Sequence, residues 1–240
     1  MKPEVNRTSN FVADAAAFIL EQARAALGER GEFRIALSGG NTPRPIYAEF
    51  SRLARELPWE RVRFTFGDER CVPPEEAQSN YRMARESLFG PCAIPEKSIL
   101  RMRGEIDPQI AAQEYEDALA LLATQHGEMI YRHDLVLLGM GDDGHTLSLF
   151  PGTAVIHEEK LWATSFFLQA QDMHRITLTR PIVNRAARIA FLTTGPKKSH
   201  ALKEVLKGAY NPDLYPSQTI MPQAGELHWF VDEAAAAELG

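Results

Sequence analysis

One segment of the chain places a histidine and a carboxylate close together in a glycine-rich turn. Residues 139–151 read Gly-Met-Gly-Asp-Asp-Gly-His-Thr-Leu-Ser-Leu-Phe-Pro and directly follow the apolar run Leu135–Leu138. An imidazole near a carboxylate is a candidate general base, because its pKa lies near working pH. A lone histidine is more often structural, but this acid–glycine–histidine order at a strand end favours function. We therefore expect His145 to accept a proton and Asp143 to orient it or stabilise its charged form.

The same segment also fits the spacing G-x-G-x-x-G of dinucleotide-binding turns. Three features argue against that interpretation. Asp142 and Asp143 would repel a pyrophosphate, and Pro151 follows too soon for the long helix that should hold it. The segment also lies in the middle of the chain, whereas this motif usually opens the fold. We expect a turn that presents His145 instead.

A second segment has the composition of an anion-binding turn. Residues 38–43 read Ser-Gly-Gly-Asn-Thr-Pro between an expected strand and an expected helix. Two glycines there let backbone N–H groups converge on an anion at the helix N-terminus. The hydroxyls of Ser38 and Thr42 add donors. The Gly-Lys-Ser/Thr ending of a Walker P-loop is absent, and a plain strand–helix turn is the alternative.

Two further segments carry cations at predicted strand ends. Arg70 follows Asp68 and Glu69, with Ser-Asn at residues 79–80 downstream. Its guanidinium could clamp a phosphate, and the two acids would position that guanidinium. Gly-Pro-Lys-Lys at residues 195–198 puts two lysines at a helix start, which is unfavourable with the helix dipole. That cost indicates that at least one lysine meets an anion. A solvated surface turn is the alternative for both segments.

Other types of catalytic or metal site lack their motifs. No serine lies in G-x-S-x-G, and no second histidine completes a zincin helix after His157. Two cysteines, Cys71 and Cys92, give neither a disulfide framework nor a metal pattern. The histidines without metal-ligand spacing are expected to be structural or solvated: His126, His133, His200 and His228.

Strands and helices are expected to alternate along most of the chain, which favours an α/β fold with a largely parallel sheet. Ligands bind such sheets at the carboxyl ends of the strands, where all four segments lie. The expected strands are Phe33–Leu37, Val62–Phe66, Leu135–Leu138, a half-exposed Arg175–Thr179, Ile189–Thr193 and His228–Val231. The expected helices run from Phe11 to near Gly28, from Pro43 to about Glu56, from about Tyr81, over Pro108–His126, over Lys197–Leu206 and over Asp232–Leu239.

Length and composition indicate an ordinary globular protein. The chain has 240 residues, 45% hydrophobic and 24% charged, with a net charge of −6. This balance disfavours general binding to nucleic acid or anionic membranes. No run approaches the roughly 20 apolar residues of a membrane span, and no signal peptide is evident. We expect one domain over residues 1–240, with a small β excursion near 160–180, in the cytoplasm.

Taken together, these segments resemble the glucosamine-6-phosphate isomerase/6-phosphogluconolactonase family, and within it the lactonase members. The Gly139–Pro151 run is highly specific, whereas Ser-Gly-Gly-x-Thr-Pro is shared more widely. Further matches are Asp-Glu-Arg at 68–70, Arg-Ile-Thr-Leu-Thr at 175–179 and Pro-Ser-Gln at 216–218. The resemblance covers about residues 10–236. It implies hydrolysis of 6-phospho-D-glucono-1,5-lactone without metal or organic cofactor. It also implies the Rossmann-like α/β fold shared with glucosamine-6-phosphate deaminase and ribose-5-phosphate isomerase.

The resemblance also implies roles for single residues. His145 is the general base and Asp143 the aspartate beside it, while Arg70 and Lys198 hold the substrate phosphate with the backbone of residues 38–40. The residues expected to bind substrate are Ser38, Gly39, Gly40, Thr42, Asp68, Arg70, Asn80, Gly141, Arg175 and Lys198.

The chain departs from some relatives at three places. Asp142 stands where proline is common, and Met-His at 173–174 stands where some members have a proline-rich run. Two lysines follow Gly195-Pro196, which leaves open whether Lys197 or Lys198 meets the phosphate.

Two other functions compete with the lactonase. An amino-sugar-phosphate deaminase would continue after Gly-His with an Ile-Ala-Phe-Asn-Glu-Pro-like run, whereas this chain reads Thr-Leu-Ser-Leu-Phe-Pro and lacks the acid. A non-catalytic sugar-phosphate sensor would usually carry a DNA-binding segment, and no basic helix-turn-helix stretch is visible. The expected partner is a small-molecule substrate, with a monomer or a small homo-oligomer as the assembly.

Overall fold

A parallel sheet forms the centre of the molecule. The structure, a computed structural model, describes residues 3–240, and within them the sheet has the order β1-β9-β8-β5-β2-β3. Every neighbouring pair in it is parallel. Its strands are β1 (Glu4–Arg7), β2 (Phe33–Leu37), β3 (Val62–Phe66), β5 (Leu135–Gly139), β8 (Arg188–Thr193) and β9 (Glu226–Val231).

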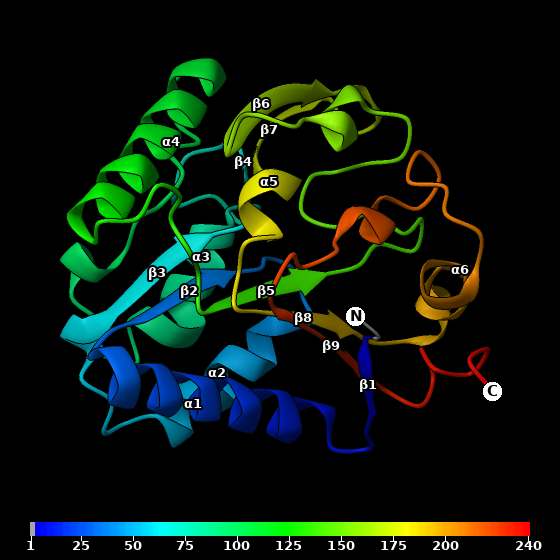
Figure 1. Ribbon diagram of the computed structural model, residues 1–240, viewed down its shortest axis with the longest axis horizontal. Coiled ribbons are helices and arrows are strands. Elements are labelled where there is room, and N and C mark those ends of the chain that lie inside the picture. Colours follow the sequence, from blue (N-terminus) through cyan, green and yellow to red (C-terminus); the bar gives the residue numbers. More distant parts are fainter. Residues whose placement is uncertain (1–2) are drawn as a thin grey trace.

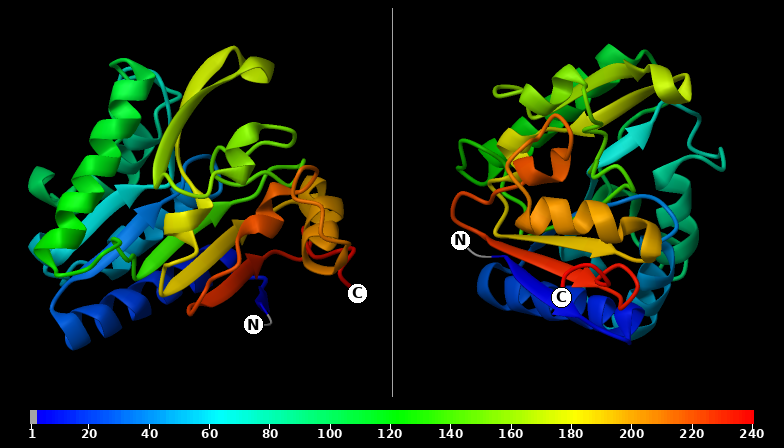
Figure 2. Two further views of the ribbon diagram at one scale, coloured as in Figure 1. Left: turned by 45° about the horizontal axis from the view of Figure 1, so that its top comes forward. Right: turned by 90° about the vertical axis from the view of Figure 1, so that its right-hand side faces the viewer.

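Helices cover both faces of this sheet (Figures 1 and 2). On one face lie α1 (Phe11–Arg30), α2 (Pro43–Leu53) and α3 (Asn80–Ala84), which continues as a π-helical turn over Arg85–Phe89. On the other lie α4 (Pro108–Gln125), α5 (Arg180–Val183) and α6 (Ser199–Lys207).

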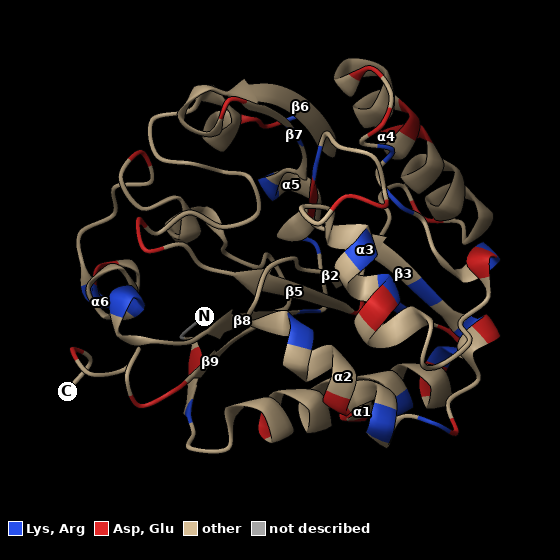
Figure 3. Ribbon diagram, turned by 180° about the vertical axis from the view of Figure 1, so that it is seen from behind, with Lys and Arg blue, Asp and Glu red and all other residues tan. Residues whose placement is uncertain are grey.

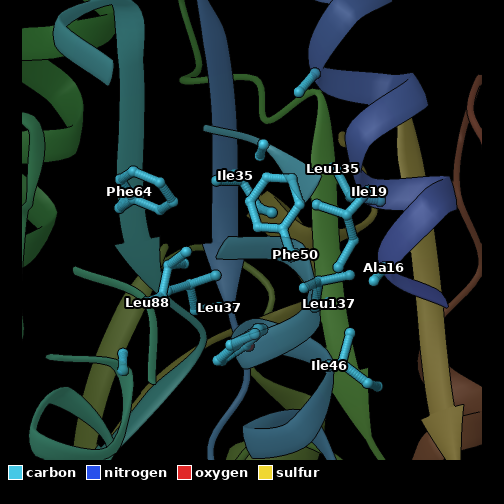
Figure 4. Close-up of a cluster of buried hydrophobic side chains, with 14 of the residues drawn as sticks. Ala16, Ile19, Ile35, Leu37, Ile46, Phe50, Phe64, Leu88, Leu135 and Leu137 are labelled. Atoms are coloured by element: carbon cyan, nitrogen blue, oxygen red, sulfur yellow. The ribbon is translucent and has the colours of Figure 1, made fainter. Parts of the chain in front are cut away.

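The strand β5 shows why two helical layers are needed. Its side chains point alternately to opposite faces, as the pleat of a strand requires. Leu135 and Leu137 pack with Ile19 and Ile46 of α1 and α2 (Figure 4). Val136 and Leu138 belong to the core on the opposite face. The uninterrupted apolar run is thus buried on both sides, as is typical of parallel strands.

A second, antiparallel sheet of the order β4-β7-β6 lies over one edge of the first. It consists of β4 (Asp68–Arg70), β6 (Ala163–Leu168) and β7 (Met173–Leu178). Gly67 joins the two sheets. Its N–H donates to the Leu37 carbonyl at 2.9 Å, and its carbonyl accepts from Leu178 N–H at 2.7 Å. The chain therefore passes from β3 into β4 within one residue.

Most expected elements are confirmed, and two expectations need correction. The strand over Arg175–Leu178 is buried rather than half-exposed, because β6 and α4 pack around β7. Residues 233–238 form turns where a final helix over 232–239 was expected. The first helix ends at Arg30, near Gly28 as expected, and is followed by Gly31, whose φ of 73° suits glycine.

Other boundaries differ by a few residues or were not foreseen. The helix α2 ends at Leu53, before the expected Glu56, and α6 begins at Ser199 after a 3-10 turn over Pro196–Lys198. The strands β1 and β4 had no expected counterpart. The strands β6 and β7 lie where the β excursion was placed.

The charged residues lie mostly on the outer helices and loops (Figure 3), with few on the central strands. Positive and negative side chains are interspersed there and form many ion pairs, such as Arg101 with Glu105 at 2.6 Å. No helix within residues 3–240 is long and apolar enough to cross a bilayer.

The buried His133 is held as a neutral ring. Its Nε2 lies 2.9 Å from Thr65 Oγ1, and that hydroxyl donates to the Ile35 carbonyl at 3.2 Å. The Thr65 oxygen therefore accepts from Nε2–H, and Nδ1 stays unprotonated without a hydrogen-bond partner. Burial, with a smaller effect of the Arg34 charge, lowers the pKa of His133 to about 3.

We predict that His133 makes the protein less stable as the pH falls. The unfolded chain takes up a proton near pH 6.5, whereas the folded chain does not until about pH 3. Stability is therefore lost progressively below about pH 6.5, and this residue alone costs about 2 kcal/mol between pH 7 and pH 5. Urea denaturation at both pH values should show a smaller loss for His133→Leu than for the wild type. His200→Leu, at an exposed histidine, should keep the wild-type loss. Equal losses in all three proteins would contradict the prediction.

Candidate active site

The four segments meet at one cavity of about 470 Å³ at the carboxyl ends of the central strands. It lies between the loops that follow β2, β5 and β8 and the edge of the second sheet. Its lining includes every residue expected to bind substrate, together with His145: Ser38, Gly39, Gly40, Thr42, Asp68, Arg70, Asn80, Gly141, His145, Arg175 and Lys198. Asp143 is not part of the lining and contacts the ring of His145.

His145 and Asp143 form a hydrogen-bonded pair. The ring Nδ1 lies 2.6 Å from Asp143 Oδ1, and the His145 backbone N–H donates to the same oxygen at 3.1 Å. A carboxylate only accepts, so Nδ1 carries the proton and Nε2 keeps its lone pair. The ring also stacks on Phe150 with centroids 4.1 Å apart. Two contacts therefore fix the plane of the imidazole and its tautomer.

The pKa of Asp143 lies below its usual value. Partial burial alone would raise this pKa, but the hydrogen bonds and the charge of His145 outweigh burial and lower it. The carboxylate is consequently ionised at neutral pH.

The turn over residues 141–144 brings the pair together and requires glycine twice. A Cβ at Gly141 would lie 2.0 Å from His145 Nδ1 and 2.4 Å from Asp143 Oδ1. Gly144 has a φ of 77°, a left-handed conformation that favours glycine. The Gly141 N–H donates to the His145 carbonyl at 2.8 Å, and the Gly144 N–H donates to the Gly141 carbonyl at 3.1 Å. These two amides are therefore not available to a substrate.

Two arginines of the second sheet face the cavity. Arg70 and Arg175 are register partners in β4 and β7, and the Nε of each is buried without a hydrogen-bond partner in the described chain. Burial lowers the pKa of Arg175, and the nearby charge of Arg70 lowers it further. The attraction of Asp68 opposes this shift but does not cancel it. Two guanidiniums side by side with unused donors form a site for an anion.

Asp68 and Glu69 hold this edge in place. Asp68 Oδ2 accepts from Ser148 Oγ at 2.7 Å, and Asp68 Oδ1 accepts from Asn80 Nδ2 at 3.2 Å. The buried Glu69 accepts from the backbone N–H groups of Arg70 and Asn80, both at 2.8 Å. Both acids therefore position the loop that carries Arg70, as the sequence indicated.

The turn after β2 offers fewer donors than expected. The Ser38 N–H donates to the Tyr47 hydroxyl at 2.9 Å, and that hydroxyl donates back to the Ser38 carbonyl. The expected contribution of the Ser38 amide to anion binding is therefore wrong. The N–H groups of Gly39 and Gly40 have no acceptor within residues 3–240, which leaves them free for an anion.

The structure distinguishes the two lysines. Lys198 lines the cavity, and its Nζ lies 2.5 Å from Asp142 Oδ1. Lys197 is exposed and does not line the cavity. Lys198 is thus the lysine of this segment that can reach a bound anion.

Two cavity residues were not picked out from the sequence. Phe150 lies between the His145 ring and the Arg175 guanidinium, whose Cζ is 5.8 Å from the Phe150 centroid. Gln171 accepts a hydrogen bond from Arg175. Phe150 belongs to the glycine–histidine segment, so its place in that motif could have marked it as a cavity residue. Gln171 lies in a short 3-10 turn between β6 and β7, where no motif marks it.

The remaining histidines do not gather into a metal site. Within residues 3–240, no cluster of three or more His, Cys, Asp or Glu residues could hold a metal ion. His157 pairs with Asp213 at 2.7 Å on the surface.

The comparisons with known proteins agree with this geometry. Residues 6–229 match the family described as glucosamine-6-phosphate isomerases/6-phosphogluconolactonase. The chain belongs to this family. Within it, the chain is 40% identical to a 6-phosphogluconolactonase of Synechocystis sp. over 243 residues, which cover 100% of this chain and 99% of the relative.

Solved structures in the family share the fold. The 6-phosphogluconolactonase of Trypanosoma brucei has a TM-score of 0.87 at 27% identity, covering 100% of this chain and 99% of that one. A monomeric glucosamine-6-phosphate deaminase has a TM-score of 0.82 at 19% identity, covering 98% and 99%. The expected deaminase-type α/β fold with a mostly parallel sheet is confirmed.

We predict that Gly39→Ala destabilises the protein, because the new Cβ would lie 1.8 Å from Asn80 Oδ1. Asn80 is buried and donates a hydrogen bond to the Asp68 carbonyl, so its side chain cannot move away without losing that bond. Overpacking of this kind costs about 1–3 kcal/mol, measurable as a lower free energy of unfolding in urea. Gly28→Ala is the control, since its Cβ would meet nothing within 4 Å on a helix, and it should stabilise by up to about 1 kcal/mol. A Gly39→Ala protein as stable as the wild type would contradict this packing.

Proposed function

We propose that this protein hydrolyses 6-phospho-D-glucono-1,5-lactone to 6-phospho-D-gluconate, the second step of the oxidative pentose phosphate pathway. One observation carries the proposal. A histidine–carboxylate pair opens on the same cavity as Arg70, Arg175 and Lys198. A base next to an anion site fits an ester that carries a phosphate. The family membership and the relatives named 6-phosphogluconolactonase support this choice of substrate.

Phosphate binding places the ring for reaction. The dianion is held by Arg70 and Lys198 with the free amides of Gly39 and Gly40, and Arg175 lies beside them. Contacts that are equal in the ground state and the transition state do not by themselves raise kcat. They fix the lactone carbonyl near His145, and this positioning converts binding free energy into rate.

His145 then carries the proton in both directions. Its neutral Nε2 takes a proton from water as the water oxygen attacks C1 of the lactone, and Asp143 stabilises the imidazolium that forms. The tetrahedral intermediate collapses, the bond from C1 to the ring oxygen breaks, and the imidazolium returns its proton to that oxygen. The products are a hydroxyl group and a carboxyl group, which ionises at neutral pH.

The oxyanion of the tetrahedral intermediate needs donors other than those of Gly141 and Gly144. Both of these amides are used within the turn. We propose that the remaining N–H groups of the 139–144 turn, those of Met140, Asp142 and Asp143, supply the donors.

The competing deaminase reaction is disfavoured by the segment after His145. Residues 146–151 hold no carboxylate, and the Ser148 hydroxyl is committed to Asp68. Ring opening of an amino sugar would lack its acid there. An assay for ammonia release from glucosamine 6-phosphate separates the two reactions.

We further propose that residues 1–240 act as one domain in the cytoplasm, as a monomer or a small homo-oligomer. The two hydrophobic cores on opposite faces of one sheet support a single domain. The net charge of −6 supports a small-molecule partner rather than nucleic acid or an anionic membrane. The reaction as written uses neither a metal nor an organic cofactor.

We predict that His145→Ala lowers kcat about 10²–10⁴-fold and leaves KM within a few fold, because it removes the base but no phosphate contact. The wild type should form 6-phosphogluconate from fresh lactone faster than the spontaneous reaction, followed through a coupled dehydrogenase. His157→Ala removes a similar histidine–aspartate pair outside the cavity and should keep full activity. Turnover by His145→Ala within a few fold of the wild type would reject His145 as the base.

Arg70→Ala should act on binding instead. Loss of a charge-assisted hydrogen bond to phosphate costs about 1.5–3 kcal/mol, so KM should rise about 10- to 100-fold. Arg103→Ala removes an exposed arginine paired with Glu114 and serves as the charge-matched control with unchanged KM. An unchanged KM for Arg70→Ala would remove Arg70 from the phosphate site.

A further inference from the structure

The cations that line the cavity differ in how they are neutralised. Within residues 3–240, Arg70 has no acidic side chain within 4.0 Å of its guanidinium, and Arg175 has Asp68 at 4.0 Å. Lys198 alone among the three makes a close ion pair, with Asp142 Oδ1 at 2.5 Å from its Nζ. This pair joins the loops that follow β5 and β8, which are neighbours in the sheet.

The carboxylate of Asp142 makes none of the hydrogen bonds that hold its own turn within the described residues. The turn is held by backbone bonds between Gly141 and His145 and between Gly144 and Gly141. Lys198 is the only partner of the Asp142 side chain in the described chain. The side chain of Asp142 is 54% exposed, whereas that of Lys198 is 23% exposed. The turn would therefore form equally well without this negative charge.

The position of the ion pair sets up a competition between two anions. The Lys198 ammonium, which would contact a phosphate dianion in the cavity, already has the Asp142 carboxylate at hydrogen-bond distance. That carboxylate must move away or remain beside a dianion, and either outcome weakens phosphate binding. In the empty cavity the same contact fixes the flexible lysine side chain and offsets a cation at a helix start.

We propose that Asp142 sets the affinity of this site for phosphorylated ligands: its carboxylate competes with their phosphate for Lys198 and so hastens product release. This inference rests on the proposed function only for the identity of the ligand. The product, 6-phosphogluconate, carries a phosphate and a new carboxylate, so it is the species that an unopposed cluster of cations would retain. The Asp142 carboxylate limits this retention without touching the reacting atoms, and the Asp142→Asn substitution leaves the backbone N–H of this residue in place.

Isothermal titration calorimetry with two probes, 6-phosphogluconate and inorganic phosphate, tests the competition without any turnover. Asp142→Asn keeps the shape of the side chain and removes its charge. A partly exposed ion pair contributes modestly, so we expect Kd for both probes to fall about two- to five-fold. KM for the lactone should fall by a similar factor. Glu60→Gln removes an exposed acid from a 3-10 turn directly before β3, at the end of the sheet away from the cavity, and should leave each Kd unchanged.

A double-mutant cycle shows whether the effect passes through Lys198. In a Lys198→Ala background, Asp142→Asn should no longer tighten binding of either probe, because the competition has been removed. Equal tightening in both backgrounds would overturn the proposal in favour of general charge repulsion. An unchanged Kd for Asp142→Asn, or no binding of either probe by either protein, would also overturn it.

The outcome separates the inference from the proposed function. Tighter phosphate binding by Asp142→Asn without lactone hydrolysis by the wild type would reject the function and keep the competition. Lactone hydrolysis by the wild type with equal Kd values for both proteins would keep the function and reject the competition.

Discussion

The buried carboxylate of Asp68 is the interaction on which the site depends. It accepts from Ser148 in the loop after β5 and from Asn80 at the start of α3, and it faces Arg175 of β7. A carboxylate is tolerated in a protein interior only where hydrogen bonds and charge replace its water. The need to satisfy one acid therefore brings three distant segments of the chain to one point. His145 and the cations that line the cavity lie on those segments or directly beside them.

Glycine provides the second constraint, at places where backbone or side chains approach closely. Gly39 packs against Asn80, Gly67 against Leu147, and Gly141 against the His145 ring. At each of these positions a single methyl group would collide with a residue of the site. Leu147 itself has a φ of 54°, an uncommon conformation for a side chain with Cβ that costs about 1–3 kcal/mol. The loop that carries His145 is thus held in a strained shape by what surrounds it.

Sequence patterns predict the inner strands of the central sheet well because these are short, largely apolar runs that must be buried on both faces. They miss the edge strand β1, which is polar and mostly exposed. They also point to His145, Asp143, Arg70 and Lys198, which the fold brings to one cavity, because each follows a glycine near the end of a predicted strand. They do not predict β4, which is three polar residues long and exists through pairing with β7. They cannot show that Tyr47 occupies the Ser38 amide, or that Asp142 pairs with Lys198. Such contacts join residues far apart in sequence, and only the packed fold brings them together.

Gly67 has a consequence for the dimensions of the cavity. Because β3 runs into β4 through this one residue, Arg70 and Arg175 of the small sheet lie at a set distance from the strand ends next to His145. At this junction no flexible linker separates the two sheets. The fold therefore fixes the distance across the cavity between the two guanidiniums and the imidazole, and only a ligand of matching length can contact both.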